Sequence, residues 1–428
     1  MLLKHFQSLE KTSNGYIVHG DKADVMLVFM TDDIIRVRVS FDRQFKEESY
    51  TLVTTAWPDR MDELLKDERT RITALDIPCE EDEKTLTFRT KTLKLVMRKC
   101  PLSFLLYDAA GRLIYADLRE RAFEKDQLGR LSHYSRIDYE HDHFYGFGEK
   151  TGHLDKKGPM YKHIPFYIRL SDQQRHALGL FYHNSYDSVF DMGQEISGYW
   201  DRYSYYQTDG GDIDLFLLNG PSVNEVLDRY TLLTGRPAMP TKQSLGYCAS
   251  TMYYAELEKD CDQEIYKVID KHRKEGVLLD NFWLASGYTS GEEDNLRYVF
   301  NWNHRRFPDP KGFFDRMNEM GINVIPNLKP GILKNHPYMP LFERNGVFIK
   351  NPGGDGDYYG RWWGGEGRFF DFTNPAARAT WKQLLEDNLL KLGAKTVWND
   401  NCEMDGVEDR EAQCDFEGAK GTMAELKI

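Results

Sequence analysis

The sequence predicts an antiparallel β-sandwich followed by part of a parallel (β/α)8 barrel of the TIM type. Two observations support this prediction. Short apolar runs with the period of β-strands fill the first half of the chain, and strands alternate with helices from about residue 243 onward. The length of 428 residues agrees with two or three domains. We therefore divide the chain into a sandwich at 1–221, a helical connector at 222–240 and a partial barrel at 241–428.

Strand-like runs dominate the first part of the chain. Residues 35–41 alternate apolar side chains with Arg36 and Arg38, the pattern of a strand with one buried face. The runs at 102–107 and 113–115 flank a polar turn and predict a hairpin. Further runs of this kind lie at 86–89, 177–182 and 213–218. Since no long helix is indicated before residue 222, we expect antiparallel sheets.

A helix is predicted directly after the sandwich. Ser222 and Glu225 have the spacing of a capping box. The helix has one apolar face, formed by Val226, Leu227, Tyr230 and Leu233. Gly235 and Pro237 end it. This segment is the predicted connector.

The second half of the chain repeats a strand, a helix and a glycine. Strands are predicted at 244–250, 278–286, 322–328 and 395–400, and helices at 260–275, 309–320 and 374–392. Asn374 caps the last helix, with Pro375 in its first turn. This repeat is typical of parallel βαβ units, which build doubly wound sheets and (β/α)8 barrels. No glycine-rich phosphate loop follows the first strand, which favours the barrel, with about its first four βα units present.

Composition narrows the classes of function. A net charge of −12 argues against a nucleic-acid or anionic-membrane partner. The six cysteines have no C-x-x-C spacing, so we expect no metal site, no cofactor and no disulfide framework. The chain has neither the apolar core of a signal peptide nor a run near the roughly 18 apolar residues of a membrane span. We therefore expect a cytoplasmic protein.

Asp400 is the leading candidate for a catalytic residue. It ends the predicted strand 395–400, and barrels present their catalytic groups at the carboxyl ends of strands. Glycoside cleavage uses a pair of carboxyl groups, one of which attacks the sugar in a retaining enzyme. The alternative is an aspartate that caps a helix in a polar turn.

The motif Trp398-x-Asp400-x-x-Glu403 resembles the nucleophile motif of glycoside hydrolase family 31, which contains α-glucosidases, α-xylosidases and transglycosylases. Segments similar to other motifs of the family follow one another in the same order, at 146–150, 161–167, 307–310, 329–332 and 371–375. The resemblance implies a retaining glycosidase that acts on α-linked glucosides or related α-glycosides, with Asp400 as nucleophile. The alternatives are a transglycosylase and a carbohydrate-binding protein without turnover.

Six further side chains are expected to bind a small carbohydrate substrate. They are Trp283, Lys329, Trp363, Asp371, Trp398 and Glu403. Lys329 has the alternative role of a salt bridge to Asp400 or Asp371. Trp363 lies in a predicted long loop, 330–373, where an apolar plug is the alternative to a sugar platform. Cys402 is expected to be a small buried residue.

The chain departs from the family pattern in two respects. Ala285 and Gly287 stand where many members have acids that hold sugar hydroxyls, which indicates a less studied bacterial branch. The acid/base of the family, an aspartate on a later barrel strand, has no counterpart after Asp400. We therefore expect a truncated or split enzyme, and a second polypeptide that completes the barrel is the alternative to truncation.

Overall fold

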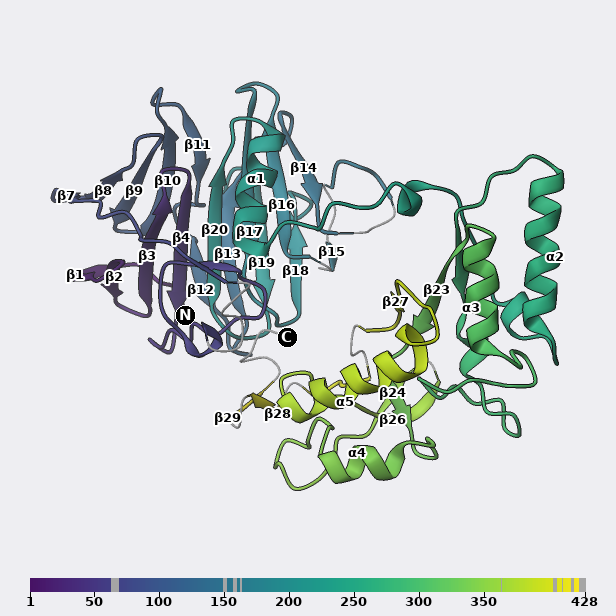
Figure 1. Ribbon diagram of the computed structural model, residues 1–428. Helices are drawn as coiled ribbons and strands as arrows, with labels where there is room; N and C mark the ends of the chain where they lie inside the picture. The colour runs from purple at the N-terminus through teal and green to yellow at the C-terminus, as the bar shows by residue number, and fades with distance from the viewer. Residues whose placement is uncertain are drawn as a thin grey trace. The chain divides into compact units, whose positions relative to one another are not determined.

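The computed structural model (Figure 1) describes residues 1–62, 69–148, 152–156, 160–161, 164–362, 364–402, 406–409, 411–416 and 419–422. The chain divides into two compact units. We call Met1–Arg236 the N-terminal unit and Pro237–Met423 the C-terminal unit. In the part of the chain that is described, no helix combines the length and the apolar character needed to cross a membrane.

Three antiparallel sheets build most of the N-terminal unit. The first contains β1 (Phe6–Thr12), β2 (Gly15–Gly20), β3 (Asp24–Thr31), β4 (Ile34–Ser40), β20 (Ile213–Asn219), β17 (His176–Tyr182), β16 (Phe166–Ser171) and β14 (Asp142–Gly146), in that spatial order. The second contains β11 (Leu113–Ala116), β10 (Leu102–Asp108), β9 (Leu93–Lys99), β8 (Thr85–Arg89) and β7 (Cys79–Glu81). The third contains β12 (Phe123–Lys125), β13 (Leu131–Arg136), β19 (Tyr203–Thr208), β18 (Ser188–Asp191) and β15 (Met160–Tyr161). The short strands β5 (Thr54–Thr55) and β6 (Thr70–Arg71) pair in parallel.

One apolar core joins these sheets into a sandwich. Val37 and Leu217 enter it from the eight-stranded sheet, Leu95 from the second sheet, and Leu131 and Tyr206 from the third. The hairpin predicted from the apolar runs around residue 110 is present as β10 and β11. The antiparallel sandwich predicted from strand periodicity is therefore found in the structure.

Strand β4 is buried on both faces, so the prediction of one buried face was wrong. Arg36 has no exposed surface, and its guanidinium donates two hydrogen bonds of 2.8 Å to the two oxygens of Asp214 on β20. A third hydrogen bond of 2.8 Å goes to Glu47, and the ring of Trp57 lies 4.1 Å from the guanidinium carbon. Segments distant in sequence cover the arginine-bearing face of β4. The alternation of residue types alone therefore did not predict that this face is buried.

Helix α1 (Val223–Thr234) begins with the predicted capping box. The side chain of Ser222 accepts from the backbone of Glu225, whose carboxylate accepts from the backbone of Ser222 in return. Its buried residues Val226 and Leu233 join a second apolar cluster with residues of the eight-stranded sheet. The helix thus covers one face of that sheet within the N-terminal unit.

The C-terminal unit is built on a parallel sheet with the order β21 (Cys248–Thr251), β22 (Asn281–Leu284), β23 (Asn323–Leu328) and β27 (Trp398–Asn399). The helices between these strands are α2 (Cys261–Lys274), α3 (Pro310–Glu319) and α5 (Pro375–Leu385), which continues as a π-helical turn at Glu386–Leu390. Asn374 caps α5 as predicted. This alternation confirms the predicted parallel βαβ units.

Segment 330–373 is not a loop, and that prediction was wrong. It contains β24 (Gly331–Leu333), α4 (Met339–Asn345), β25 (Gly360–Trp362) and β26 (Gly365–Phe369), and its strands form a small antiparallel sheet. A Cβ added at Gly331 would come within 2.2 Å of the Trp362 ring. A glycine at this position therefore allows the Trp362 indole to lie against the backbone. Strands β28 (Gln413–Phe416) and β29 (Ala419–Thr422) form a separate hairpin.

Candidate active site

The parallel sheet has one face covered by helices and one face that carries half-buried aromatic and polar side chains. Phe282 and Val324 enter the core with the helices. Register pairs Trp283 with Ile325 and Asn327 with Trp398, so these side chains share the opposite face. Lys329 and Asp400 directly follow the last residues of β23 and β27. They continue the alternation of each strand and therefore lie on the same face. The candidate site lies here, at the carboxyl ends of β23 and β27.

Asp400 is held by two side chains of the neighbouring strand. Its backbone N–H donates to the carbonyl of Leu328 at 2.8 Å. Its Oδ2 accepts from Nδ2 of Asn327 at 2.8 Å and forms an ion pair with Nζ of Lys329. The Asp400 side chain retains 24% of its exposure and that of Lys329 only 9%. Of the roles weighed for Lys329, the structure shows the salt bridge to Asp400.

The surroundings of Asp400 favour its ionised form. Partial burial by itself raises the pKa of this carboxyl group. The hydrogen bonds from Lys329 and Asn327 and the positive charge of Lys329 outweigh burial, so the pKa of Asp400 lies below its ordinary value of 3.8. Asp400 is therefore an anion at neutral pH, the state that a carboxylate nucleophile requires.

Replacing Lys329 by methionine is expected to raise the pKa of Asp400, because the Asn327 amide and the backbone N–H of Asn401 then oppose the effect of burial without the ammonium group. In the native chain the folded-state pKa is below the unfolded value, so ionised Asp400 stabilises the fold above the unfolded pKa. That stabilisation is lost as the pH falls through the folded pKa. Carboxyl ¹³C NMR titration of the two proteins, with Asp400→Asn to assign the resonance, measures the shift.

The matched control for this variant is Lys311→Met. Lys311 forms an exposed ion pair with Asp315 on α3 at 2.7 Å, so its loss removes a similar charge without touching the strand ends. The Asp400 resonance should titrate unchanged in this control. A Lys329→Met protein in which Asp400 titrates no higher than in the native chain would contradict the assigned electrostatics.

Two tryptophans lie on the same face as Asp400. The rings of Trp283 and Trp398 have centroids 5.0 Å apart and planes inclined at 64°. Both side chains are partly exposed. In the described part of the chain, neither Nε1 of Trp283 nor Oδ1 of Asn327 has a hydrogen-bond partner, although both atoms are buried. The partly exposed rings of Trp283 and Trp398 form an aromatic surface next to Asp400 that suits a sugar ring.

Asp371 does not join this group. It is 2% exposed, and its Oδ1 accepts from the backbone N–H of Thr373 at 2.9 Å. Its Oδ2 accepts from the backbone N–H of Asp415 at 2.6 Å. Among the described residues, no hydrogen bond links Asp371 to Lys329 or Asp400. The structure thus gives its carboxylate a role in holding the turn before α5 and the strand β28.

Trp363 and Glu403, which the sequence suggested as substrate ligands, lie outside the described residues. Cys402 is exposed, so the prediction of a buried residue was wrong. The preceding Asn401 has a left-handed backbone with φ of 50°, and the chain turns toward solvent directly after the strand.

Sequence reasoning missed residues that support Asp400. Asn327 lies two positions before Lys329 on the same strand, and alternation on that strand would have placed both on one face. The fully buried Tyr288 donates from its hydroxyl to the carbonyl of Asn327 at 2.8 Å. Arg306 in turn donates to the carbonyl of Gly287 at 2.9 Å and to Oγ of Ser290 at 2.7 Å. These bonds fix the loop after β22 against β23.

The same loop explains the missing acids. Ala285 is 2% exposed and belongs to the apolar core of the unit. A Cβ added at Gly287 would lie 2.3 Å from the carbonyl oxygen of Ala255. A carboxylate at position 285 would place a charge in the apolar core. A side chain at position 287 would force the backbone around Ala255 to move.

Comparison with known proteins agrees with this arrangement. The model of the glycosyl hydrolase 31 N-terminal galactose mutarotase-like domain matches residues 24–159 and 157–191. The model of the glycosyl hydrolases family 31 TIM-barrel domain matches residues 237–425. Together the two models span more than half of the chain, in the order in which the sandwich and the parallel sheet follow one another.

Related proteins and structures extend over both units. Alpha-glucosidase 2 of Bacillus thermoamyloliquefaciens is 28% identical in an alignment 419 residues long that covers 92% of this chain and 48% of the relative. Alpha-xylosidase XylQ of Lactiplantibacillus pentosus is 26% identical over 357 residues, 78% of this chain and 44% of the relative. The structure of a Flavobacterium johnsoniae GH31 dextranase complexed with glucose superposes with a TM-score of 0.81 at 20% identity, covering 100% of this chain and 51% of the dextranase.

The chain thus spans about half the length of the relatives it matches. Its two parts, their order and the motif around Asp400 agree with a single family. This chain belongs to glycoside hydrolase family 31.

Proposed function

We propose that this chain carries the nucleophile of a retaining glycosidase that acts on α-linked glucosides or related α-glycosides. The observation that supports this most directly is the anionic Asp400 at the end of a parallel strand, paired with Lys329 and Asn327. The proposal also draws on the relatives, which include an alpha-glucosidase and an alpha-xylosidase. Trp283 and Trp398 supply the surface against which the sugar ring packs.

The reaction is a double displacement. Both side-chain donors contact Oδ2 of Asp400, which leaves Oδ1 to attack the anomeric carbon. The bond from that carbon to the leaving oxygen breaks, a carboxylic acid gives this oxygen a proton, and a β-glycosyl ester forms on Asp400; the family resemblance places that acid on a later barrel strand. Water, or a second sugar in a transfer reaction, then gives a proton to the same acid's carboxylate as it attacks the carbon and releases Asp400, so the two inversions give net retention.

Trapping of the glycosyl ester tests this proposal. Fluoride leaves 5-fluoro-α-D-glucosyl fluoride without needing a proton, so the first step depends on the nucleophile and not on a separate acid. The ring fluorine slows hydrolysis, and the ester accumulates. We expect a mass increase of one fluoroglucosyl group, located by peptide mapping on Asp400 and absent from Asp400→Asn. The xylosyl counterpart of the reagent tests the second sugar class.

The alternative is a carbohydrate-binding protein without turnover, in which Trp283 and Trp398 bind the sugar ring and Asp400 does not attack. It predicts a different result in the same experiment. Glucose-containing oligosaccharides would bind in calorimetric titrations, but neither fluoride would label the protein. A label on a residue other than Asp400 would contradict the assigned nucleophile while leaving a glycosidase in place.

A further inference from the structure

We propose that the N-terminal unit carries a second carbohydrate site, a groove along β11 that binds a neutral oligosaccharide. We call it the β11 groove. It is separate in sequence and in lining from the residues around Asp400. Only the choice of glucose oligomers as ligands rests on the proposed function; the groove itself rests on the geometry of the N-terminal unit.

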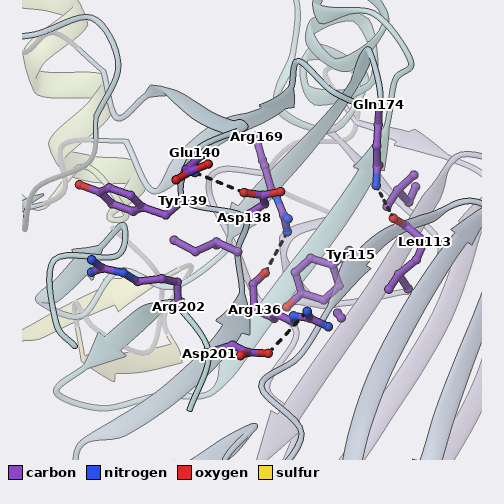
Figure 2. Close-up of a pocket in the computed structure, with 13 residues that line it drawn as sticks. Leu113, Tyr115, Arg136, Asp138, Tyr139, Glu140, Arg169, Gln174, Asp201 and Arg202 are labelled. Atoms are coloured by element: carbon purple, nitrogen blue, oxygen red, sulfur yellow. Dashed lines mark hydrogen bonds and ion pairs between the residues drawn. The ribbon is translucent and has the colours of Figure 1, made fainter. Parts of the chain in front are cut away.

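Two adjoining cavities form the β11 groove. The first has a volume of about 610 Å³ and is shown in Figure 2, and the second has a volume of about 590 Å³. Leu113, Ala116, Arg136 and Asp201 line both cavities, so the two cavities adjoin one another. Volumes of this size are those of sites for ligands larger than a single ion.

The charges that line the groove balance. Its arginines are Arg98, Arg119, Arg136, Arg169 and Arg202, and its acids are Asp117, Glu120, Asp138, Glu140 and Asp201. The buried Asp117 carboxylate accepts from the Tyr115 hydroxyl and Arg169 is paired with Asp142, so four arginines and four acids remain for a ligand. A site for phosphate or a polyanion would need an excess of positive charge. A balanced set of guanidinium donors and carboxylate acceptors instead matches the hydroxyl groups of a neutral sugar, which donate and accept.

Several of these groups are held in place before any ligand arrives. Arg136 pairs with Asp201 at 3.5 Å, and Arg169 donates to the carbonyl of Arg136 at 3.2 Å, as Figure 2 shows. The backbone N–H of Glu140 donates to Asp138 at 3.3 Å. In the described chain, the Glu140 carboxylate itself has no hydrogen-bond partner. It is an acceptor open to a ligand hydroxyl.

Aromatic rings stand in both cavities. Tyr199 in the second cavity is 95% exposed, and the neighbouring Trp200 is partly exposed. In the first cavity the guanidinium of Arg202 lies 4.7 Å from the ring centroid of Tyr139. A tyrosine side chain as exposed as that of Tyr199 contributes little to the stability of the fold. Its flat face is suited to stack on the C–H face of a sugar ring.

A peptide strand added to β11 is the main competing occupant, and the structure disfavours it. Strand β11 has only four residues. Gln174 already donates from Nε2 to the carbonyl of Leu113 at 2.9 Å, and Asp117 pairs with Ser135 directly after the strand. Strand addition needs a run of open backbone groups, which this edge lacks at both ends.

Calorimetric titration of the full chain with maltoheptaose and isomaltoheptaose tests the β11 groove. We expect Tyr199→Ala to weaken binding of at least one oligomer about tenfold, the effect of removing one well-placed aromatic contact. The matched control is Tyr247→Ala, which removes a tyrosine that is 55% exposed in the C-terminal unit and should leave binding unchanged. Hydrogen exchange should show protection by the oligomer at 113–116 and 199–202.

The Asp400→Asn variant separates this proposal from the proposed function. Binding to the β11 groove should persist in Asp400→Asn, whereas glycosyl trapping should persist in Tyr199→Ala. The groove proposal is overturned if neither oligomer binds, or if Asp400→Asn abolishes all binding while Tyr199→Ala has no effect. Failure of trapping with retained, Tyr199-dependent binding would count against the nucleophile alone. Circular dichroism checks that both variants fold.

Discussion

Replacement of Asp400 by asparagine is expected to slow formation of the glycosyl ester by about 10⁴-fold or more, the scale on which loss of a member of a nucleophilic triad acts. The amide keeps the shape of the side chain and its contact with Asn327, but it has no anionic oxygen for attack. Quenched-flow release of fluoride from α-glucosyl fluoride measures the step. The control is Asp315→Asn on the exposed face of α3, which should change the rate by less than about twofold.

Chemical rescue separates attack from positioning. In Asp400→Ala the removed carboxylate leaves space next to Lys329, and added formate can occupy it as an external nucleophile. We expect formate to restore fluoride release in the alanine variant in proportion to its concentration. A purely structural Asp400 would give a variant that formate does not help.

Replacing Asp214 by alanine is expected to lower the free energy of unfolding of the N-terminal unit by about 3–5 kcal/mol, because it leaves a buried charge without its partner. Asp214 is 1% exposed and accepts two hydrogen bonds from Arg36, and its Oδ2 lies 3.0 Å from Nδ1 of His183. Among the described residues, removal of the carboxylate leaves Glu47 as the remaining anionic partner of the buried Arg36 guanidinium. Urea dependence of hydrogen exchange in the β4 and β20 peptides measures the change for this unit.

Two further variants show whether the effect comes from the unpaired charge. Glu80→Ala breaks the exposed ion pair with Arg89, in which both side chains are more than half exposed, and should cost no more than about 1 kcal/mol. The double variant Arg36→Met/Asp214→Leu removes both charges and should recover part of the loss. Equal effects of Asp214→Ala and Glu80→Ala would show that the buried pair does not stabilise the sandwich in this way.

Local signals in the sequence predicted much of the C-terminal unit. Asn374 and Pro375 mark the start of α5, and the alternation of strands and helices gave the parallel sheet. These signals depend on neighbours within a few residues, which is why a single chain reveals them. For Lys329 the sequence left a substrate contact and salt bridges to Asp400 or Asp371 open, and the structure shows the pair with Asp400.

Features built by distant segments were beyond such reasoning. Arg36 and Asp214 are 178 positions apart, and alternation on β4 placed Arg36 on a solvent face that other segments cover. The contact of Tyr288 with the carbonyl of Asn327 depends on how a 3-10 helix, η4 (Ser286–Thr289), packs on the next strand. The β11 groove likewise combines residues from widely separated segments, and no local pattern announces it.

The ion pair of Lys329 with Asp400 has opposite consequences for the two halves of the proposed double displacement. A carboxylate of lowered basicity is a weaker nucleophile, so the pair slows attack on the sugar. The same carboxylate is a better leaving group, because its departing negative charge is received by Lys329. The geometry therefore favours rapid breakdown of the ester and release of the sugar. In Lys329→Met we expect the ester to accumulate and to persist longer than in the native chain.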